Sequence, residues 1–330
     1  MAQVLGNVDI GASKVLVGVS SMMGELHEES VASFVTPATP EELLRLITSG
    51  LRGAARSDSI ERIGCVAPGP IDYVNGVISR MHNKSWAPIP VVAGLQRSFA
   101  CEVRLEDDAA GAALAEALVG AGAGHDPVAY ITVSSGIGAG LVVNGELYRG
   151  AHGTAGEIGH IVIDPTGPLC NCGRYGDVES YAGGMSLLRQ IVARWPDPGK
   201  YGSSDRSPAE LFLRAAAGDE RALEMHEHGR NALARCFAAI AALWDPEVIV
   251  VGGSVALGQP QWIEESIELA RELCMAEVGT EIAFELATLG KMSALIGAGL
   301  LAAKPSSAGE RSLRLDTQEK LLNKLGATGV

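Results

Sequence analysis

A histidine and two cysteines with the chemistry of metal ligands lie within one short, glycine-punctuated stretch of the sequence. His160 is followed by Cys170 and Cys172, and imidazole and thiolate are the groups that Zn²⁺ prefers. The spacing predicts a zinc clip that pins this loop, with a metal-free loop holding two buried thiols as the alternative. Glu157 and Glu179 bracket the clip. Two carboxylates held in place by a pinned loop suit recognition of a polyhydroxylated ligand.

Two segments have the small, polar turns that suit phosphate binding. The first joins two β-rich runs through the residues after Asp9, and the second lies within residues 130–143 and contains Ser134-Ser135-Gly136. Small residues let backbone N–H groups approach a phosphate, and Asp9 could hold Mg²⁺ directly or through water. Many hairpins contain Asp and Gly, so the first turn alone is weak. Its repetition in both halves of the chain predicts a duplicated fold that clamps a nucleotide between two lobes.

Three consecutive carboxylates, Glu106-Asp107-Asp108, follow a predicted strand at 101–105 and open an alanine-rich helix. Such a run is most often a solvated face or a helix N-terminus, where negative charge complements the helix dipole. In open α/β folds, however, ligands bind at strand-to-helix junctions of this kind. We therefore expect the chemistry at this junction.

The remaining elements must position these groups. Residues 41–55 have the apolar spacing of a helix with one buried face, and residues 208–217 and 220–243 also predict helices. A buried strand at 63–67 ends in a Pro-Gly turn at Gly69, and residues 75–76 predict a tight turn. A second buried strand precedes Gly252-Gly253, which would let an adenine or ribose lie against the backbone.

These motifs together resemble the ROK family, which contains bacterial glucokinases, N-acetylmannosamine kinases, N-acetylglucosamine kinases and sugar-responsive repressors. The likeness rests on Gly156-Glu157-Ile158-Gly159-His160 and the Cys-x-Cys segment, and it extends from Asp9 to about Ala303. It implies the α/β fold of the actin-like ATPases, a duplicated ribonuclease H-like unit forming two lobes with a cleft between them. The expected lobes are residues 1–118 with a returning helix at about 293–315, and 119–292 with the clip. Residues 316–330 would be a tail, either mobile or an oligomer contact.

The resemblance also implies an activity and a set of site residues. The activity is ATP-dependent phosphorylation of a hexose or N-acylhexosamine at the 6-hydroxyl, with Asp108 as general base. The implied sugar-binding residues are Gly69, Asn83, Asp107, Asp108, Glu157, His160 and Glu179. The implied residues for ATP and Mg²⁺ are Asp9, Gly11, Ala12, Ser13, Lys14, Ser135, Gly136, Gly252 and Gly253. The implied ligands for a structural Zn²⁺ are His160, Cys170, Cys172 and Asp177.

The chain departs from the family pattern within these segments. Ala12-Ser13 and Ser134-Ser135 each replace Gly-Thr, and Asp177 replaces a cysteine; an aspartate oxygen is an accepted zinc ligand. Asp107 replaces an asparagine. An ionised aspartate can only accept hydrogen bonds, and its charge should disfavour ionisation of the neighbouring Asp108. We therefore expect an altered sugar preference or a higher pH optimum.

The sugar and the rival function stay open at this stage. Glu157, His160 and Glu179 resemble the glucokinases, whereas the segments 164–174 and 251–255 resemble bacterial N-acetylmannosamine kinases. The departures also fit a sugar-binding sensor that does not catalyse. A DNA-binding repressor is not expected, since only residues 1–8 precede Asp9.

Composition excludes several other classes of protein. The 330 residues carry a net charge of −13, which argues against a general nucleic-acid surface, and six cysteines are too few for a disulfide scaffold. No signal peptide or membrane-spanning run is present in the sequence. We expect a cytoplasmic enzyme without nucleic-acid or membrane partners. It would form a homodimer or homotetramer, as members of the family commonly do.

Overall fold

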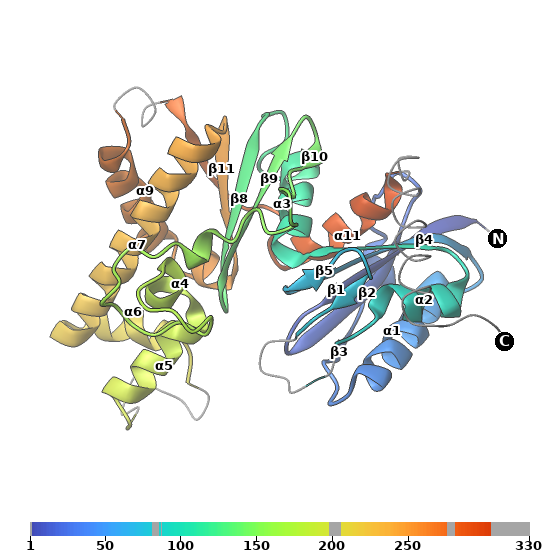
Figure 1. Cartoon of the computed structure of the whole chain (residues 1–330), viewed down its shortest axis with the longest axis horizontal. Helices are drawn as coiled ribbons and strands as arrows, with labels where there is room; N and C mark the ends of the chain where they lie inside the picture. Colours follow the sequence, from blue (N-terminus) through green and yellow to red (C-terminus); the bar gives the residue numbers. More distant parts are fainter. Residues whose placement is uncertain (1, 81–85, 87, 198–205, 276–280, 305–330) are drawn as a thin grey trace. The chain divides into compact units, whose positions relative to one another are not determined.

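The computed structural model describes residues 2–80, 86, 88–197, 206–275 and 281–304. The chain forms two compact units: residues up to Gly111 with the helix from Ala294 onward make the first, and Ala112–Ser293 makes the second. The chain passes from one unit to the other inside helix α3 (Asp108–Val119) and returns at the start of helix α11 (Ser293–Ala303). Figure 1 shows both units in cartoon form.

The first unit is built on a five-stranded sheet with the strand order β3-β2-β1-β4-β7. Strands β1, β2 and β3 are antiparallel, and β4 and β7 continue the sheet parallel to β1. The parallel core strands are nearly continuous runs of buried residues, as expected for strands covered on both faces. The strand bounds are β1 Gln3–Ile10, β2 Lys14–Ser20, β3 Ala32–Val35, β4 Ser59–Ala67 and β7 Glu102–Asp107. A small hairpin of β5 (Ile71–Asp72) and β6 (Val77–Ile78) lies outside this sheet.

The second unit repeats this topology. Its strand order is β10-β9-β8-β11-β12, in which β8 pairs antiparallel with β9, β9 with β10, and β11 and β12 run parallel to β8. The bounds are β8 Val128–Val133, β9 Ile137–Val143, β10 Glu146–Leu147, β11 Val248–Gly252 and β12 Ala283–Leu286. The repeated order confirms the predicted duplicated α/β fold of the actin-like type.

Helices α1 (Pro40–Ala55) and α2 (Val91–Phe99) belong to the first unit. Helix α1 confirms the prediction from periodicity: the Thr39 side chain accepts from the backbone N–H of Glu42 at its start, and Leu43, Ile47 and Leu51 form its buried face. Helix α11 packs so tightly on the sheet that a Cβ at Gly64 would lie 1.8 Å from the Ala298 carbonyl oxygen. Only glycine fits at that position of β4.

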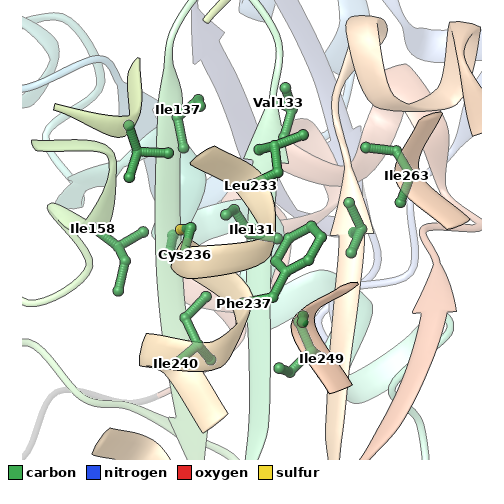
Figure 2. Close-up of a cluster of buried hydrophobic side chains, with 14 of the residues drawn as sticks. Ile131, Val133, Ile137, Ile158, Leu233, Cys236, Phe237, Ile240, Ile249 and Ile263 are labelled. Atoms are coloured by element: carbon green, nitrogen blue, oxygen red, sulfur yellow. The ribbon is translucent and has the colours of Figure 1, made fainter. Parts of the chain in front are cut away.

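Helices in the second unit enclose a separate core. The long helix α7 (Glu220–Trp244) begins at Asp219, whose side chain accepts from two backbone N–H groups, and it lays Phe237 and Ile240 against Ile131 of β8 and Ile249 of β11 (Figure 2). The shorter helical elements are η1 Glu28–Ser30 in the first unit and, in the second, η2 Ile158–His160, α4 Val178–Ala182, α5 Gly184–Arg194, α6 Ala209–Ala216, α8 Ser254–Gly258, α9 Pro260–Leu273 and η4 Gly290–Met292.

Among the described residues, no helix is both long and apolar enough to cross a bilayer. All six cysteines are free thiols. The predicted tail at 316–330 lies outside the described residues.

Candidate functional site

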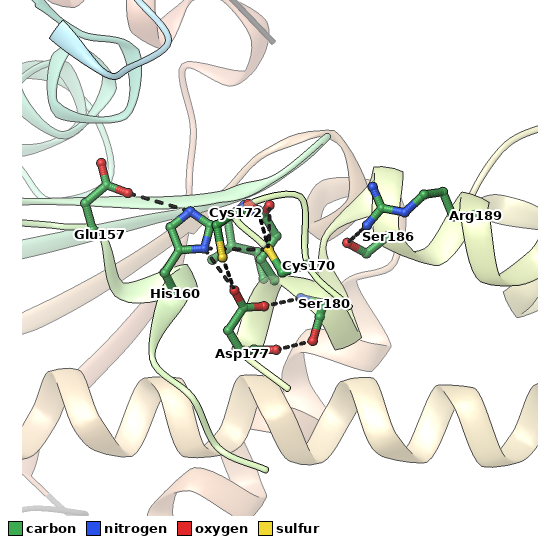
Figure 3. Close-up of polar contacts among 10 residues, drawn as sticks. Glu157, His160, Cys170, Cys172, Asp177, Ser180, Ser186 and Arg189 are labelled. Carbon is green, nitrogen blue, oxygen red and sulfur yellow. Dashed lines mark hydrogen bonds and ion pairs between the residues drawn. The ribbon is translucent and has the colours of Figure 1, made fainter. Parts of the chain in front are cut away.

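The structure brings the predicted metal ligands together in the second unit. His160 ends helix η2, Cys170 and Cys172 lie in the following loop, and Asp177 directly precedes helix α4. One ligand atom from each of the four lies within 4.8 Å of the others (Figure 3). A tetrahedral zinc site with bonds of about 2.0–2.3 Å would place its ligand atoms roughly 3.3–3.8 Å apart. The donor set and its spacing therefore fit a zinc ion after small movements. We call these four residues the clip.

The two carboxylate oxygens of Asp177 have different partners, and together these contacts hold the side chain in place. Oδ1 accepts from the Ser180 backbone N–H at 2.8 Å and caps helix α4, while Oδ2 lies 3.0 Å from His160 Nδ1 and 3.3 Å from Cys172 Sγ. Burial raises the pKa of Asp177, but hydrogen bonds from His160, Cys170, Ser180 and Cys172 together outweigh it and lower the pKa to about 2. The carboxylate is thus held ionised, as a metal ligand must be.

The ring of His160 faces two ways. Its Nδ1 points to Asp177 within the clip, and its Nε2 lies 3.8 Å from a carboxylate oxygen of Glu157 (Figure 3). The Glu157 side chain is 58% exposed, so its carboxylate is open to solvent. Glu179 is half-buried in the first turn of α4, with Oε1 3.7 Å from Cys170 Sγ. Three residues that the family resemblance implies for sugar binding, Glu157, His160 and Glu179, therefore lie in or beside the clip.

The second phosphate-type turn and the glycine pair meet at one edge of the second sheet. Strands β8 and β11 are parallel neighbours, so the residues that follow their carboxyl ends come together. Ser134 Oγ lies 3.0 Å from Ser254 Oγ. Gly253 has a φ of +94°, and a Cβ there would lie 2.4 Å from the Val133 carbonyl oxygen. Glycine is therefore required at position 253, where the chain passes from β11 into α8 against the end of β8. Ser135 and Gly136 lie in the turn that follows β8.

The first phosphate-type turn closes the β1–β2 hairpin in the first unit. The Gly11 N–H donates to the Lys14 carbonyl at 2.9 Å, and the Thr36 hydroxyl donates to the Gly11 carbonyl at 2.7 Å. Ala12 and Ser13 are therefore at the tip of a turn held from both sides. Asp9, two residues before this turn, is half-buried. Burial raises its pKa to about 6, against an opposing effect of the Lys14 ammonium.

The predicted catalytic junction lies at the same edge of the first sheet as Asp9. Strands β1, β4 and β7 are parallel, and their registers place Asp9 opposite Val66 and Ala67 opposite Asp107. Asp107 ends β7 and Asp108 begins α3. A Cβ at Gly69 would lie 3.5 Å from Asp107 Oδ2, so the Pro-Gly turn lies beside the junction.

Asp107 also caps the helix that follows it. Its Oδ1 accepts from the backbone N–H groups of Ala109 at 3.0 Å and Ala110 at 3.3 Å. An asparagine could cap through its amide oxygen in the same way. The substitution therefore keeps the start of α3 and changes only what the second side-chain atom presents. Asn83, the remaining predicted sugar residue, lies outside the described residues.

Sequence reasoning assigned no role to two buried carboxylates. Glu106 is 1% exposed, and its Oε1 accepts from the Tyr73 hydroxyl at 2.8 Å and from the Asp107 N–H at 3.1 Å. Glu116 is fully buried in α3 and accepts several hydrogen bonds. Glu116 had a detectable signal, since a charged residue within the small, apolar run after Asp108 needs buried partners. Glu106 was hidden among the adjacent carboxylates.

Comparison with known proteins gives a consistent result. A model of the ROK family matches residues 5–305. The chain is similar to the glucokinase of Thermotoga maritima, at 31% identity over 257 residues that cover 76% of this chain and 81% of that protein. It is also similar to an N-acetylmannosamine kinase of Escherichia coli, at 32% identity over 299 residues that cover 89% and 97%. The crystal structure of a ROK family glucokinase from Streptomyces griseus in complex with glucose and AMPPNP matches with a TM-score of 0.76 at 30% identity, covering 91% of this chain and 99% of that one.

Proposed function

Because the chain belongs to the ROK family, we propose that it is an ATP-dependent sugar kinase that phosphorylates a hexose or an N-acylated hexosamine at the 6-hydroxyl. The observation that carries this proposal is the carboxylate junction at the end of β7, where Asp108 begins helix α3 beside Asp107. Relatives at about 30% identity are glucokinases and N-acetylmannosamine kinases, and the Streptomyces griseus relative binds glucose and AMPPNP.

Asp108 is the general base in this proposal. A sugar hydroxyl is a poor nucleophile, and a carboxylate at hydrogen-bond distance can take its proton as the oxygen attacks the γ-phosphorus. The new bond joins the sugar oxygen to phosphorus, the bond to the β–γ bridging oxygen breaks, and ADP leaves. Asp107 and Gly69 would line the sugar at this junction, and Asn83 is the further predicted contact from the same unit.

The nucleotide would use both phosphate-type turns. Asp9 with Mg²⁺ and the backbone of Gly11, Ala12, Ser13 and Lys14 would serve the phosphates from the first unit. In the second unit, Ser135 and Gly136 would serve the phosphates, and Gly252 and Gly253 would serve the adenosine. Backbone N–H groups in such turns stabilise phosphate charge without side-chain rearrangement. The substitutions Ala12 and Ser134 add side-chain bulk in these turns. The affinity for ATP is therefore the property that they would change most.

A zinc ion would be held by the clip, through His160, Cys170, Cys172 and Asp177. When bound it supplies a fixed structural crosslink. The chain's own residues do the rest: His160 would bind metal through Nδ1 and turn Nε2 toward the sugar, and Glu157 and Glu179 would accept hydrogen bonds from sugar hydroxyls. A homodimer or homotetramer is the expected assembly, which size-exclusion chromatography with light scattering would test.

The experiment that tests the proposal measures ATP-dependent ADP release with glucose, mannose, glucosamine, N-acetylglucosamine and N-acetylmannosamine. Turnover on one of them, with the phosphate at O6 by ³¹P and ¹³C NMR, is the expected result and identifies the sugar. Relatives of both kinds are equally similar, so glucose and N-acetylmannosamine are the first candidates. Binding of sugar and nucleotide without turnover on any sugar would instead support the non-catalytic sensor, which the substitutions Ala12, Asp107, Ser134 and Asp177 favour.

A further inference from the structure

Glu179 touches both the clip and the second phosphate-type turn. Its Oε2 accepts from the Ile137 backbone N–H at 2.9 Å, directly after that turn, and its Oε1 lies 3.7 Å from Cys170 Sγ. The contact with the turn leaves no spare room, because a Cβ at Gly136 would lie 2.5 Å from Glu179 Oε2. One carboxylate therefore joins a candidate metal site to a candidate phosphate site within the same unit.

The turn is also held by the helix that follows Glu179. Gly184 N–H donates to the Ser134 carbonyl and Met185 N–H donates to the Ser135 carbonyl, both at 2.8 Å. These two donors belong to the first turn of α5, which is separated from α4 only by Gly183. The two donors that hold the Ser134 and Ser135 carbonyls thus follow α4 directly in the chain.

The start of α4 is in turn fixed by the clip. Asp177 caps this helix through Oδ1 and faces the other clip residues through Oδ2. Helix α4 has only five residues, and Glu179 is two residues beyond the cap. The capping residue Asp177 and Glu179 therefore lie within one helical turn of each other.

We propose that Glu179 is a positioning residue that couples the clip to the phosphate turn, so that metal in the clip strengthens nucleotide binding. The inference rests on the proposed metal and nucleotide roles of these segments. A metal crosslinks four groups that hydrogen bonds alone would hold more loosely. Metal-depleted protein must then order α4 and Glu179 when it binds nucleotide, and that ordering weakens the apparent affinity. Linkage is reciprocal, so nucleotide must raise metal affinity by the same factor.

The test measures ADP binding by calorimetry without sugar, at constant Mg²⁺, on zinc-loaded protein and on protein stripped with a zinc-selective chelator. Elemental analysis gives the metal content, and circular dichroism checks that the stripped protein stays folded. The expected result is ADP binding about 10-fold tighter in the loaded protein, within the usual range of coupling between two sites. In the reverse titration, saturating ADP should raise zinc affinity by the same factor.

Three variants distinguish a specific loss of the coupling between the clip and the turn from a non-specific effect of substitution. Glu179→Ala should keep its zinc but lose the coupling, so that loaded and stripped forms bind ADP equally. Glu179→Gln should retain most of the coupling, because its amide oxygen can still accept from the Ile137 N–H. Glu157→Ala is the matched control: it removes a carboxylate on the other side of the clip, one that lies against His160 Nε2, and it should couple as the wild type does.

The outcomes that overturn the proposal are distinct from one another. If the wild type binds zinc stoichiometrically but its loaded and stripped forms bind ADP with equal affinity, the proposed coupling is wrong. The metal and nucleotide roles are then unaffected. Wild-type coupling in Glu179→Ala shows that another contact carries it. Failure to bind zinc, or failure of the loaded protein to bind ADP, overturns the link together with the corresponding part of the proposed function.

Discussion

Asp107 shows how one substitution can keep a local structure while changing the chemistry beside it. Its Oδ1 caps helix α3 by accepting from Ala109 and Ala110, a role that an asparagine oxygen also fills. Its Oδ2 is on the side of Gly69. An asparagine would offer a donor there, whereas the ionised aspartate offers a second acceptor and a negative charge beside Asp108.

We therefore predict that Asp107→Asn shifts the acidic limb of the pH–rate profile to lower pH and changes the ranking of sugars in kcat/KM. Removal of the neighbouring charge favours ionisation of Asp108, which is the form that acts as base. The free energy of unfolding should change by less than about 1 kcal/mol because the cap is kept. Asp107→Ala, which loses cap and charge together, is the control. An unchanged pH profile and sugar ranking in Asp107→Asn would contradict this account.

A second prediction at the residue scale concerns Asp9 and the pH dependence of the free energy of unfolding. Burial raises the pKa of Asp9 from 3.8 to about 6 in the folded protein. The folded state then holds this proton more tightly than the unfolded chain. Asp9 therefore costs stability as pH rises from about 4 to about 6, and the cost stays constant above that range.

Asp9→Asn should accordingly raise the free energy of unfolding at pH 7.5 by up to about 3 kcal/mol, at roughly 1.4 kcal/mol per pKa unit. The gain should vanish below about pH 4, where both states are protonated. Denaturant titrations without Mg²⁺ or nucleotide measure it, and Lys14→Met provides a comparison in which the opposing charge is removed. Activity should fall even as stability rises, since the proposed Mg²⁺ contact is lost. Equal stability of wild type and variant at pH 7.5 would show that the carboxylate is adequately solvated.

At the scale of elements, Glu116 joins the end of α3 to the start of α11. Its Oε2 accepts from the N–H groups of Ala121 at 3.0 Å and Thr288 at 3.2 Å, and its Oε1 accepts from the Leu289 N–H at 3.0 Å and the Ser293 hydroxyl at 2.9 Å. These contacts lie close to the two places where the chain crosses between units. Three backbone donors would lose their partner if this carboxylate were removed.

Glu116→Ala should lower the free energy of unfolding by about 2–5 kcal/mol, because buried donors are left without acceptors and a cavity forms. Glu116→Gln keeps one acceptor oxygen and should lose less. Chemical denaturation measures both, and Glu285→Ala, which removes an exposed carboxylate from β12, should be within about 0.5 kcal/mol of wild type. A loss below 1 kcal/mol in Glu116→Ala would mean that water replaces the carboxylate.

The elements themselves were largely predictable from the sequence. Helix α1 appears where its apolar periodicity predicts it, helix α11 appears where the resemblance to the ROK family places it, and β8 and β11 end where small polar turns begin. Contacts between residues far apart in the chain could not be predicted from the sequence. The contact between Glu179 and the Ile137 N–H joins residues far apart in the chain, and its existence depends on how α4 packs beside β9.

The whole molecule is a duplication, and the duplication was visible in the sequence as two turns of similar plan. The two sheets share one strand order and one pattern of parallel and antiparallel pairs. Three members of the clip, His160, Cys170 and Cys172, were predicted because their residue types are rare and closely spaced, and the fourth, Asp177, was predicted from the resemblance to the ROK family. Glu106 was not, since three adjacent carboxylates look alike until the strand and helix assign each a different direction.

The central claim is that Asp108 is the base of a sugar kinase, and the most direct test compares wild type with Asp108→Asn on the sugar that the wild type turns over. The substitution keeps size and hydrogen bonding but cannot accept the hydroxyl proton. We predict that kcat falls by about 10²–10⁴-fold, while calorimetric affinities for sugar and ADP stay within about threefold, as expected for a group that acts mainly in the transition state. A variant that keeps kcat within a few-fold of wild type would contradict the account.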